Sequence, residues 1–145
     1  MKTQDLIGPA LDWAVAKCEG YTLVFFDEFF RLNGLASGIS EARVDSMLGF
    51  QPLKGKWTRR NSVGGCTEIY GYSTDWGQGG PIIEREKICP WFTTSDGFWK
   101  AAPLAYMDGD ISIMDSVGPT PLIAAMRAYV ASKLGDEIEI PEELK

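Results

Sequence analysis

The segment from Thr120 to Gly135 constrains the fold most, because it specifies both ends and one face of a helix. Thr120 is a typical helix N-cap, and Pro121 suits the first helical position, where its missing N–H has no partner to lose. Gly135 suits the position just after the helix. The spacing of apolar residues predicts a stripe that must be buried against other elements. The stripe consists of Leu122, Ala125, Met126, Tyr129 and Val130, with the stem of Lys133 at its end.

Other segments predict one more long helix and several strands. Apolar residues at helical spacing from Pro9 to Glu19, followed by Gly20, predict an N-terminal helix. β-Branched and aromatic residues favour strands elsewhere. These elements predict the α+β class, with a small antiparallel sheet packed with an N-terminal and a C-terminal helix. Strands are expected in the first half of 21–30, at 67–70, 81–89 and 110–114, and in a hairpin over 91–101.

The chain has 145 residues, which suits a single domain with its own core. Within that domain, repeated glycines and Pro52 interrupt residues 32–61, which we interpret as a loop-rich insertion with one short helix at 40–48. Residues 136–145 hold five acids and one base. We expect this acidic tail to extend over the surface.

Composition excludes several functional classes. The chain has no histidine, which removes Ser-His and Cys-His nucleophile pairs and the usual zinc, copper and non-haem iron sites. The net charge is −6, whereas a duplex-binding surface needs a positive excess. No apolar run is long enough to cross a bilayer, and no signal peptide is apparent. Neither a membrane nor a nucleic acid is therefore an expected partner.

Three cysteines stand at wide spacings, without any C-x-x-C pair. We interpret Cys18, Cys66 and Cys89 as small hydrophobic residues of a reducing cytoplasm. No cofactor and no metal site are predicted. The oligomeric state stays open.

The stretch from Gly71 to Glu86 is the strongest candidate for a binding site. Its glycines permit close backbone approach to a ligand, and its aromatic and polar side chains suit a small, polar, partly planar molecule. A structural turn is the alternative, with Trp76 filling the core. Pro81 and the missing lysine exclude a phosphate-binding loop of the Walker type. The candidate ligand-binding residues are Tyr72, Ser73, Thr74, Asp75, Trp76 and Gln78, with Arg85 or Arg127 supplying charge.

Three further patterns offer weaker chemistry. Glu84 and Glu86 would lie about 7 Å apart on one face of the strand expected there, which is a glycosidase-like pair or a solvated face. The basic segment 54–60 could contact a nucleic-acid backbone or an acidic partner, but a solvated loop that offsets local acids is the favoured interpretation. The acids Asp108, Asp110 and Asp115 favour a turn over a cation site, because they do not follow the spacing of a calcium loop.

The strings at 72–76, 79–86 and 118–127 resemble the signature of the NinX-like phage protein family, a family of unknown function. The start of the chain, from Ala10 to Ala16, is similar as well. The resemblance covers 1–21, 70–92 and 118–144 and leaves about 28–61 outside. It implies a protein of tailed phages and prophages of enteric bacteria, made in the host cytoplasm. It implies no mechanism and no catalytic residue.

Three hypotheses of function follow. The first is a non-enzymatic binder of a small, nucleotide-like ligand, which sequesters a host signal. The second is a protein-interaction module that modulates a host or phage factor, supported by the aromatic content, the insertion and the acidic tail. The third is a carboxylate-based hydrolase that uses Glu84 and Glu86. The lack of histidine favours binding over catalysis.

Overall fold

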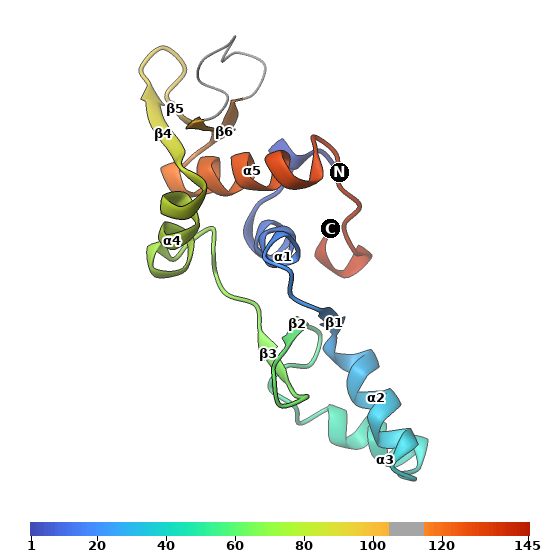
Figure 1. Ribbon diagram of the computed structural model, residues 1–145. Coiled ribbons are helices and arrows are strands. Elements are labelled where there is room, and N and C mark those ends of the chain that lie inside the picture. Colours follow the sequence, from blue (N-terminus) through green and yellow to red (C-terminus); the bar gives the residue numbers. More distant parts are fainter. Residues whose placement is uncertain (105–114) are drawn as a thin grey trace. The chain divides into compact units, whose positions relative to one another are not determined.

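The computed structural model describes residues 1–104 and 115–145 (Figure 1). These residues form α-helices and two antiparallel sheets of three strands, which confirms the α+β class. They group into two compact units. Unit 1 consists of Met1–Glu19 and Tyr70–Lys145, and unit 2 of Gly20–Ile69. Unit 2 encloses the whole of the predicted insertion, and the number of independently folding domains stays a prediction.

The sheet of unit 1 has the strand order β4-β5-β6, with β6 at Ser116–Gly118. β4 (Ile88–Thr93) and β5 (Phe98–Pro103) form the predicted hairpin, in which Thr93 pairs with Phe98. The turn ends at Gly97, whose φ of 71° is the left-handed conformation that glycine adopts freely. The hairpin prediction is therefore confirmed.

Helix α5 (Pro121–Leu134) packs against this sheet and against α1 (Gly8–Cys18), as Figure 1 shows. The predicted N-cap is present, because Thr120 Oγ1 accepts a hydrogen bond of 3.1 Å from the amide of Ile123. The predicted stripe is too narrow: Ile123, Ala124 and Ala128 are buried as well. Partners on several sides cover the helix, so its apolar surface extends well beyond one face.

The two ends of the chain pair with each other in unit 1. Lys2 forms a β-bridge with Glu137, and the amide of Ile138 donates to the carbonyl oxygen of Met1 at 2.9 Å. Ile138 and Ile140 are buried, while the acids between and beside them are exposed. The prediction of a tail that only extends over the surface is thus wrong for the two isoleucines, whose apolar side chains alternate with the acids. Short 3-10 helices lie at Thr3–Asp5 and Glu142–Leu144.

Helix α4 (Trp76–Glu86) replaces the predicted loop up to Gly80 and most of the predicted strand 81–89, of which only Ile88 and Cys89 lie in a strand, β4. Asp75 starts the helix, since its carboxylate accepts a 2.8 Å hydrogen bond from the amide of Gly77. Gly79 is buried against Leu122 of α5, and this contact offsets the cost of Pro81 inside the helix. Lys87, with a φ of 52°, ends the helix before β4.

Unit 2 contains a second antiparallel sheet, of order β1-β2-β3, and two helices. Residues 32–61 contain more regular structure than predicted, because the end of a second helix and a strand lie there in addition to the predicted short helix. Gly34 does not break its helix but lets the neighbouring helix approach: a Cβ there would lie 2.7 Å from Val44 Cγ2. The elements are β1 (Leu23–Phe25), α2 (Phe26–Ala36), α3 (Glu41–Leu48), β2 (Trp57–Arg60) and β3 (Cys66–Glu68).

Two sequence predictions for unit 2 agree with the structure. The short helix at 40–48 is confirmed as α3, although the Ser40 side chain forms no capping hydrogen bond. The strand predicted at 67–70 overlaps β3. The strand predicted at 110–114, and Asp108 and Asp110, lie outside the described residues.

Adjacent glycines of α4 make a matched pair for testing how closely α4 packs. A Cβ at position 79 would lie 2.4 Å from the carbonyl oxygen of Tyr72 and 2.6 Å from Leu122 Cδ1, whereas a Cβ at position 80 meets nothing within 4 Å. We expect Gly79→Ala to lower the free energy of unfolding by about 1–3 kcal/mol through overpacking. Gly80→Ala should raise it by up to about 1 kcal/mol, the helix propensity difference. Urea unfolding of both variants measures this, and equal effects would contradict the packing of α4.

Candidate functional site

The turn before α4 is tied to α1 by a carboxylate. The amide of Ser73 donates to Asp12 Oδ1 at 2.8 Å, and Tyr72 and Ser73 are buried. Burial raises the pKa of Asp12, and the hydrogen bond from the Ser73 amide opposes that rise. These two residues of the predicted ligand site therefore hold the turn in place.

Four of the predicted ligand residues in the 72–78 turn face solvent at least in part. Trp76 is 53% exposed at the first position of α4, so its ring does not fill the core. Thr74 is exposed and Gln78 is half-buried. Asp75 is exposed too, but one of its carboxylate oxygens serves as the helix cap. The turn thus presents one flat ring, one hydroxyl and one amide to solvent.

The two arginines of the predicted site have partners outside the 72–78 turn. Arg127 donates to the carbonyl oxygens of Leu6 and Val117, at 2.9 and 2.7 Å, and burial lowers its pKa. Arg85 binds Glu19 at the end of α1. The ligand site formed by all eight residues stays a prediction, since both guanidinium groups already serve as ties between elements.

Glu19 is the centre of a polar network that joins α1, α4 and α5. Its carboxylate accepts two hydrogen bonds from Arg85 and one of 2.8 Å from the hydroxyl of Tyr129. Although burial acts to raise it, these hydrogen bonds hold the pKa of Glu19 below its usual value. Burial, followed by the contact with Glu19, raises the pKa of Tyr129, so the phenol stays protonated and donates.

The carboxylates proposed for hydrolysis do not form a pair. Residues two apart on a helix point to different sides, so Glu84 and Glu86 separate once 76–86 is helical. Glu86 pairs with Arg85 at 3.1 Å and with Lys133 at 3.4 Å, whereas Glu84 is exposed. The strand-based pairing is wrong because the cap at Asp75 starts a helix there.

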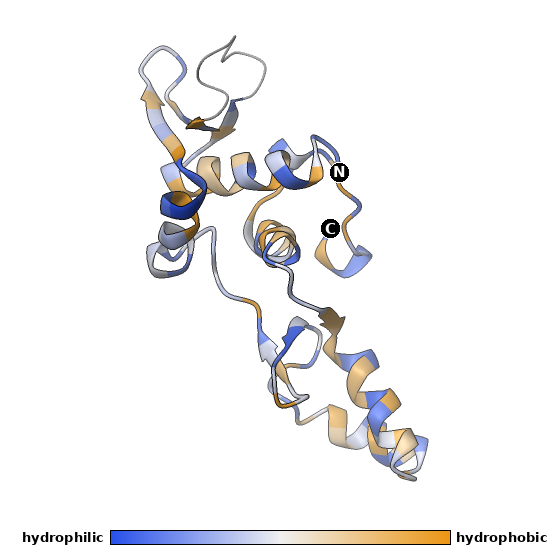
Figure 2. Cartoon of the chain, viewed as in Figure 1, coloured by the Kyte–Doolittle hydropathy of each residue, from blue (hydrophilic) through white to orange (hydrophobic). Residues whose placement is uncertain are grey.

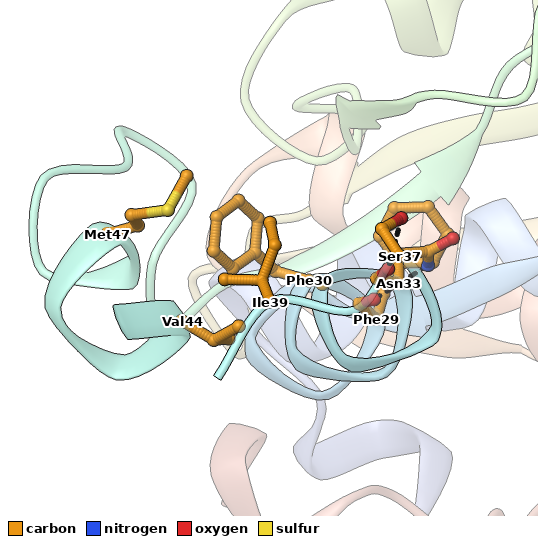
Figure 3. Close-up of a pocket in the computed structure, with 8 residues that line it drawn as sticks. Phe29, Phe30, Asn33, Ser37, Ile39, Val44 and Met47 are labelled. Atoms are coloured by element: carbon orange, nitrogen blue, oxygen red, sulfur yellow. Dashed lines mark hydrogen bonds between the residues drawn. The ribbon is translucent and has the colours of Figure 1, made fainter. Parts of the chain in front are cut away.

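Unit 2 contains a hollow of 220 Å³ between α2 and α3. Figure 3 shows Phe30, Ile39 and Val44 together, with Met47 opposite, while Asn33 and Ser37 lie on the other side with Phe29. Asn33 donates to the Phe29 carbonyl and Ser37 to the Asn33 carbonyl, so the polar groups there are bonded along α2. The lining is otherwise apolar: Phe29, Phe30, Gly34, Ile39, Val44 and Met47.

Apolar side chains beside the hollow are exposed. Met47 of the lining is 39% exposed, and Phe50, whose amide donates to the carbonyl oxygen of Met47, is 87% exposed. Hydrophobic residues are spread along α2 (Figure 2). The hollow is not predicted by the sequence, because Gly34 indicates a break where α2 continues. The spacing of Phe26, Phe29 and Phe30 is the signal that predicts a helix there.

The basic segment 54–60 is part of the fold of unit 2. Lys56 pairs with Glu68, and Arg59 donates to the carbonyl oxygen of Glu68. The guanidinium of Arg60 lies 4.6 Å from the ring centre of Phe29, which lines the hollow. These contacts join β2 to its neighbours.

The described residues offer neither a cluster of metal ligands nor a membrane-spanning helix, and their cysteines are free. Over residues 1–104 and 115–145, no group of three metal-ligating side chains comes together, and no helix is long and apolar enough to cross a bilayer. The three cysteines are free thiols. Burial and the neighbouring Glu19 raise the pKa of Cys18 to about 11, so this thiol is a poor nucleophile at neutral pH.

A family model for bacteriophage P22 NinX matches residues 2–133. The chain belongs to the phage P22 NinX family. The matched range includes 28–61, the segment that the sequence resemblance left outside. No curated protein matches the chain. The NinX assignment identifies a phage protein, and the contacts described above must supply the argument for its function.

The depressed pKa of Glu19 predicts a pH-dependent contribution to the stability of unit 1. Because the folded state favours the ionised carboxylate, this contribution is present above the ordinary glutamate pKa and is lost as pH falls through the folded value. We expect Glu19→Gln to lower the free energy of unfolding by about 1–2 kcal/mol at pH 7. The deficit should shrink at pH 3.

The matched control for Glu19→Gln is Glu84→Gln, which removes an exposed carboxylate of α4. It should change the free energy of unfolding by less than about 0.5 kcal/mol at either pH. Urea unfolding at pH 7 and pH 3 measures both variants. A Glu19→Gln deficit of the same size at the two pH values would contradict the role given to the carboxylate.

Proposed function

We propose that this NinX-family chain works as a protein-binding module, with the hollow between α2 and α3 as its docking surface. The observation that carries the proposal is an open apolar hollow bordered by exposed apolar side chains. Contiguous exposed apolar surface on a soluble domain is typical of interaction sites. The partner inserts an apolar side chain into the hollow, as anchor residues do at protein interfaces.

The size and chemistry of the hollow favour a protein side chain over a polar metabolite. Its lining offers carbon surface on nearly every side, and its two polar side chains already bond to carbonyl oxygens of α2. A polar ligand entering it would lose hydrogen bonds to water and regain few from this lining. An aliphatic or aromatic side chain loses none.

The family membership suggests where such binding takes place. A phage protein that binds other proteins acts during infection on a host or phage factor in the host cytoplasm. The hydrolase hypothesis loses its motive, because Glu84 and Glu86 do not share a face and Glu86 is paired with cations. Binding without catalysis is the simpler function for this chain.

Photocrosslinking tests the docking surface. We expect p-benzoylphenylalanine placed at Met47 or at Ile39, on two sides of the hollow, to capture the same identified polypeptide in infected cells. The matched control position is Val63, which is 88% exposed in the same unit but does not line the hollow. Equal capture from Val63, or no capture from Met47 and Ile39, would refute the docking surface.

The small-ligand hypothesis remains a second candidate because Trp76 is exposed beside Thr74 and Gln78. An exposed indole at a helix start offers a face for stacking on a planar ligand. We expect a nucleotide that binds there to raise the melting temperature of the wild type and of Phe92→Ala but not of Trp76→Ala. Phe92 is the control, since it is 50% exposed in the same unit. If no nucleotide of a panel separates Trp76→Ala from the wild type, this candidate fails.

A further inference from the structure

Phe50 is the most exposed aromatic residue of the described chain, at 87%, and it lies beside the hollow. Its amide donates to the carbonyl oxygen of Met47 at 3.2 Å, and Met47 lines the hollow. A projecting ring and an apolar hollow are therefore neighbours on the same small unit.

We propose that the polypeptide that docks on unit 2 is a second copy of this chain, with Phe50 of each copy inserted into the α2–α3 hollow of the other. The inference rests on the proposed function and names the partner for the same surface. A twofold interface requires one self-complementary patch, on which residue i meets residue j and j meets i. Phe50 and the hollow supply such a pair.

The volume of the hollow fits this exchange. An apolar cavity of about 150 Å³ holds a benzene ring. The hollow of unit 2 measures 220 Å³, so a phenyl ring enters it without forcing α2 and α3 apart. Phe30, Ile39 and Met47 would then contact the ring of the second copy from several sides (Figure 3).

Unit 2 also lacks apolar burial of its own. All of its residues are described, and only three of its apolar side chains are buried: Phe26, Val44 and Leu48. Small units seldom obtain enough stability from such a core, and association is one way to supplement it. Leu32 and Leu35 of α2, 60% and 42% exposed, leave further apolar surface of the unit uncovered.

Charge favours a meeting of two copies through unit 2 rather than unit 1. Residues 20–69 contain six basic and five acidic side chains, whereas the rest of the chain contains eight basic and fifteen acidic ones. The net negative charge of unit 1 therefore makes two copies of it repel each other, whereas the nearly neutral unit 2 adds almost no repulsion between copies. Arg31 of α2 and Asp45 of α3 form an ion pair at 2.8 Å, so these two charges neutralise each other on this unit.

Sedimentation of the full chain over a range of concentrations tests the dimer. We expect the wild type to dimerise, and Phe50→Ala to raise the dissociation constant at least about a hundredfold, because a twofold interface loses two rings at once. Val63→Ala is the matched control, since Val63 is equally exposed in the same unit, and it should leave the constant within about twofold. A monomeric wild type, or equal effects of the two substitutions, would overturn the inference.

Mixing two variants tests the reciprocal geometry. Met47→Glu places a charge at the hollow but keeps Phe50, whereas Phe50→Ala keeps the hollow. A mixed dimer then retains one intact ring-and-hollow contact, so the mixture should associate more tightly than either variant alone. Circular dichroism confirms that both variants are folded, and a mixture no tighter than its components would refute the exchange.

The outcomes separate this inference from the proposed function. If the wild type is monomeric while Met47 and Ile39 crosslink to a different protein, the surface docks proteins but the partner is not a second copy. If crosslinks from position 50 join two differently isotope-labelled copies at Met47 or Ile39, both statements are supported. If the chain is monomeric and neither position captures any protein, both fail.

Discussion

Burial of α5 on nearly all sides is the constraint on which unit 1 depends. The helix is apolar around most of its circumference, so the sheet and α1 have to cover it together. The approach is close at Gly118, where a Cβ would lie 2.7 Å from the amide nitrogen of Ala124. Arg127 is a charged residue in the middle of this helix, and its hydrogen bonds to the carbonyl oxygens of Leu6 and Val117 tie the N-terminal segment and β6 to α5. The position of each neighbouring element is thereby set relative to one helix.

Two carboxylates of α1 hold the chain where it leaves unit 1 and where it returns. Glu19 is the last residue before unit 2 and binds Arg85, while Asp12 accepts the amide of Ser73 soon after the chain comes back. Unit 1 thus contains both the extensive core and the polar ties. Unit 2 has a small core and much exposed apolar surface. Uncovered apolar surface is typical of interaction sites, which is why the docking surface is proposed in unit 2.

The extent to which the sequence predicted these features depends on how local each signal is. The cap at Thr120, the glycine after α5 and the turn at Gly97 act over a few residues, and the helix and hairpin they define were predicted correctly. Pro81 and the glycines around it indicated a loop and a strand, yet contact of Gly79 with Leu122 stabilises a helix there. Gly34 indicated a break, whereas it allows α3 to approach α2. Both errors occurred where a distant residue decided the outcome.

By itself, the sequence determined the α+β class, the ends of α1 and α5, the hairpin and the phage family, because caps, turns and periodicity are local and the family strings are long. Tertiary structure alone decided that Trp76 faces solvent, that Arg85 and Arg127 tie elements together, and that a hollow opens between α2 and α3. Each of these depends on which distant segments meet and how closely their side chains pack. Propensity and spacing describe a segment, but burial and pairing are properties of the contacts between segments.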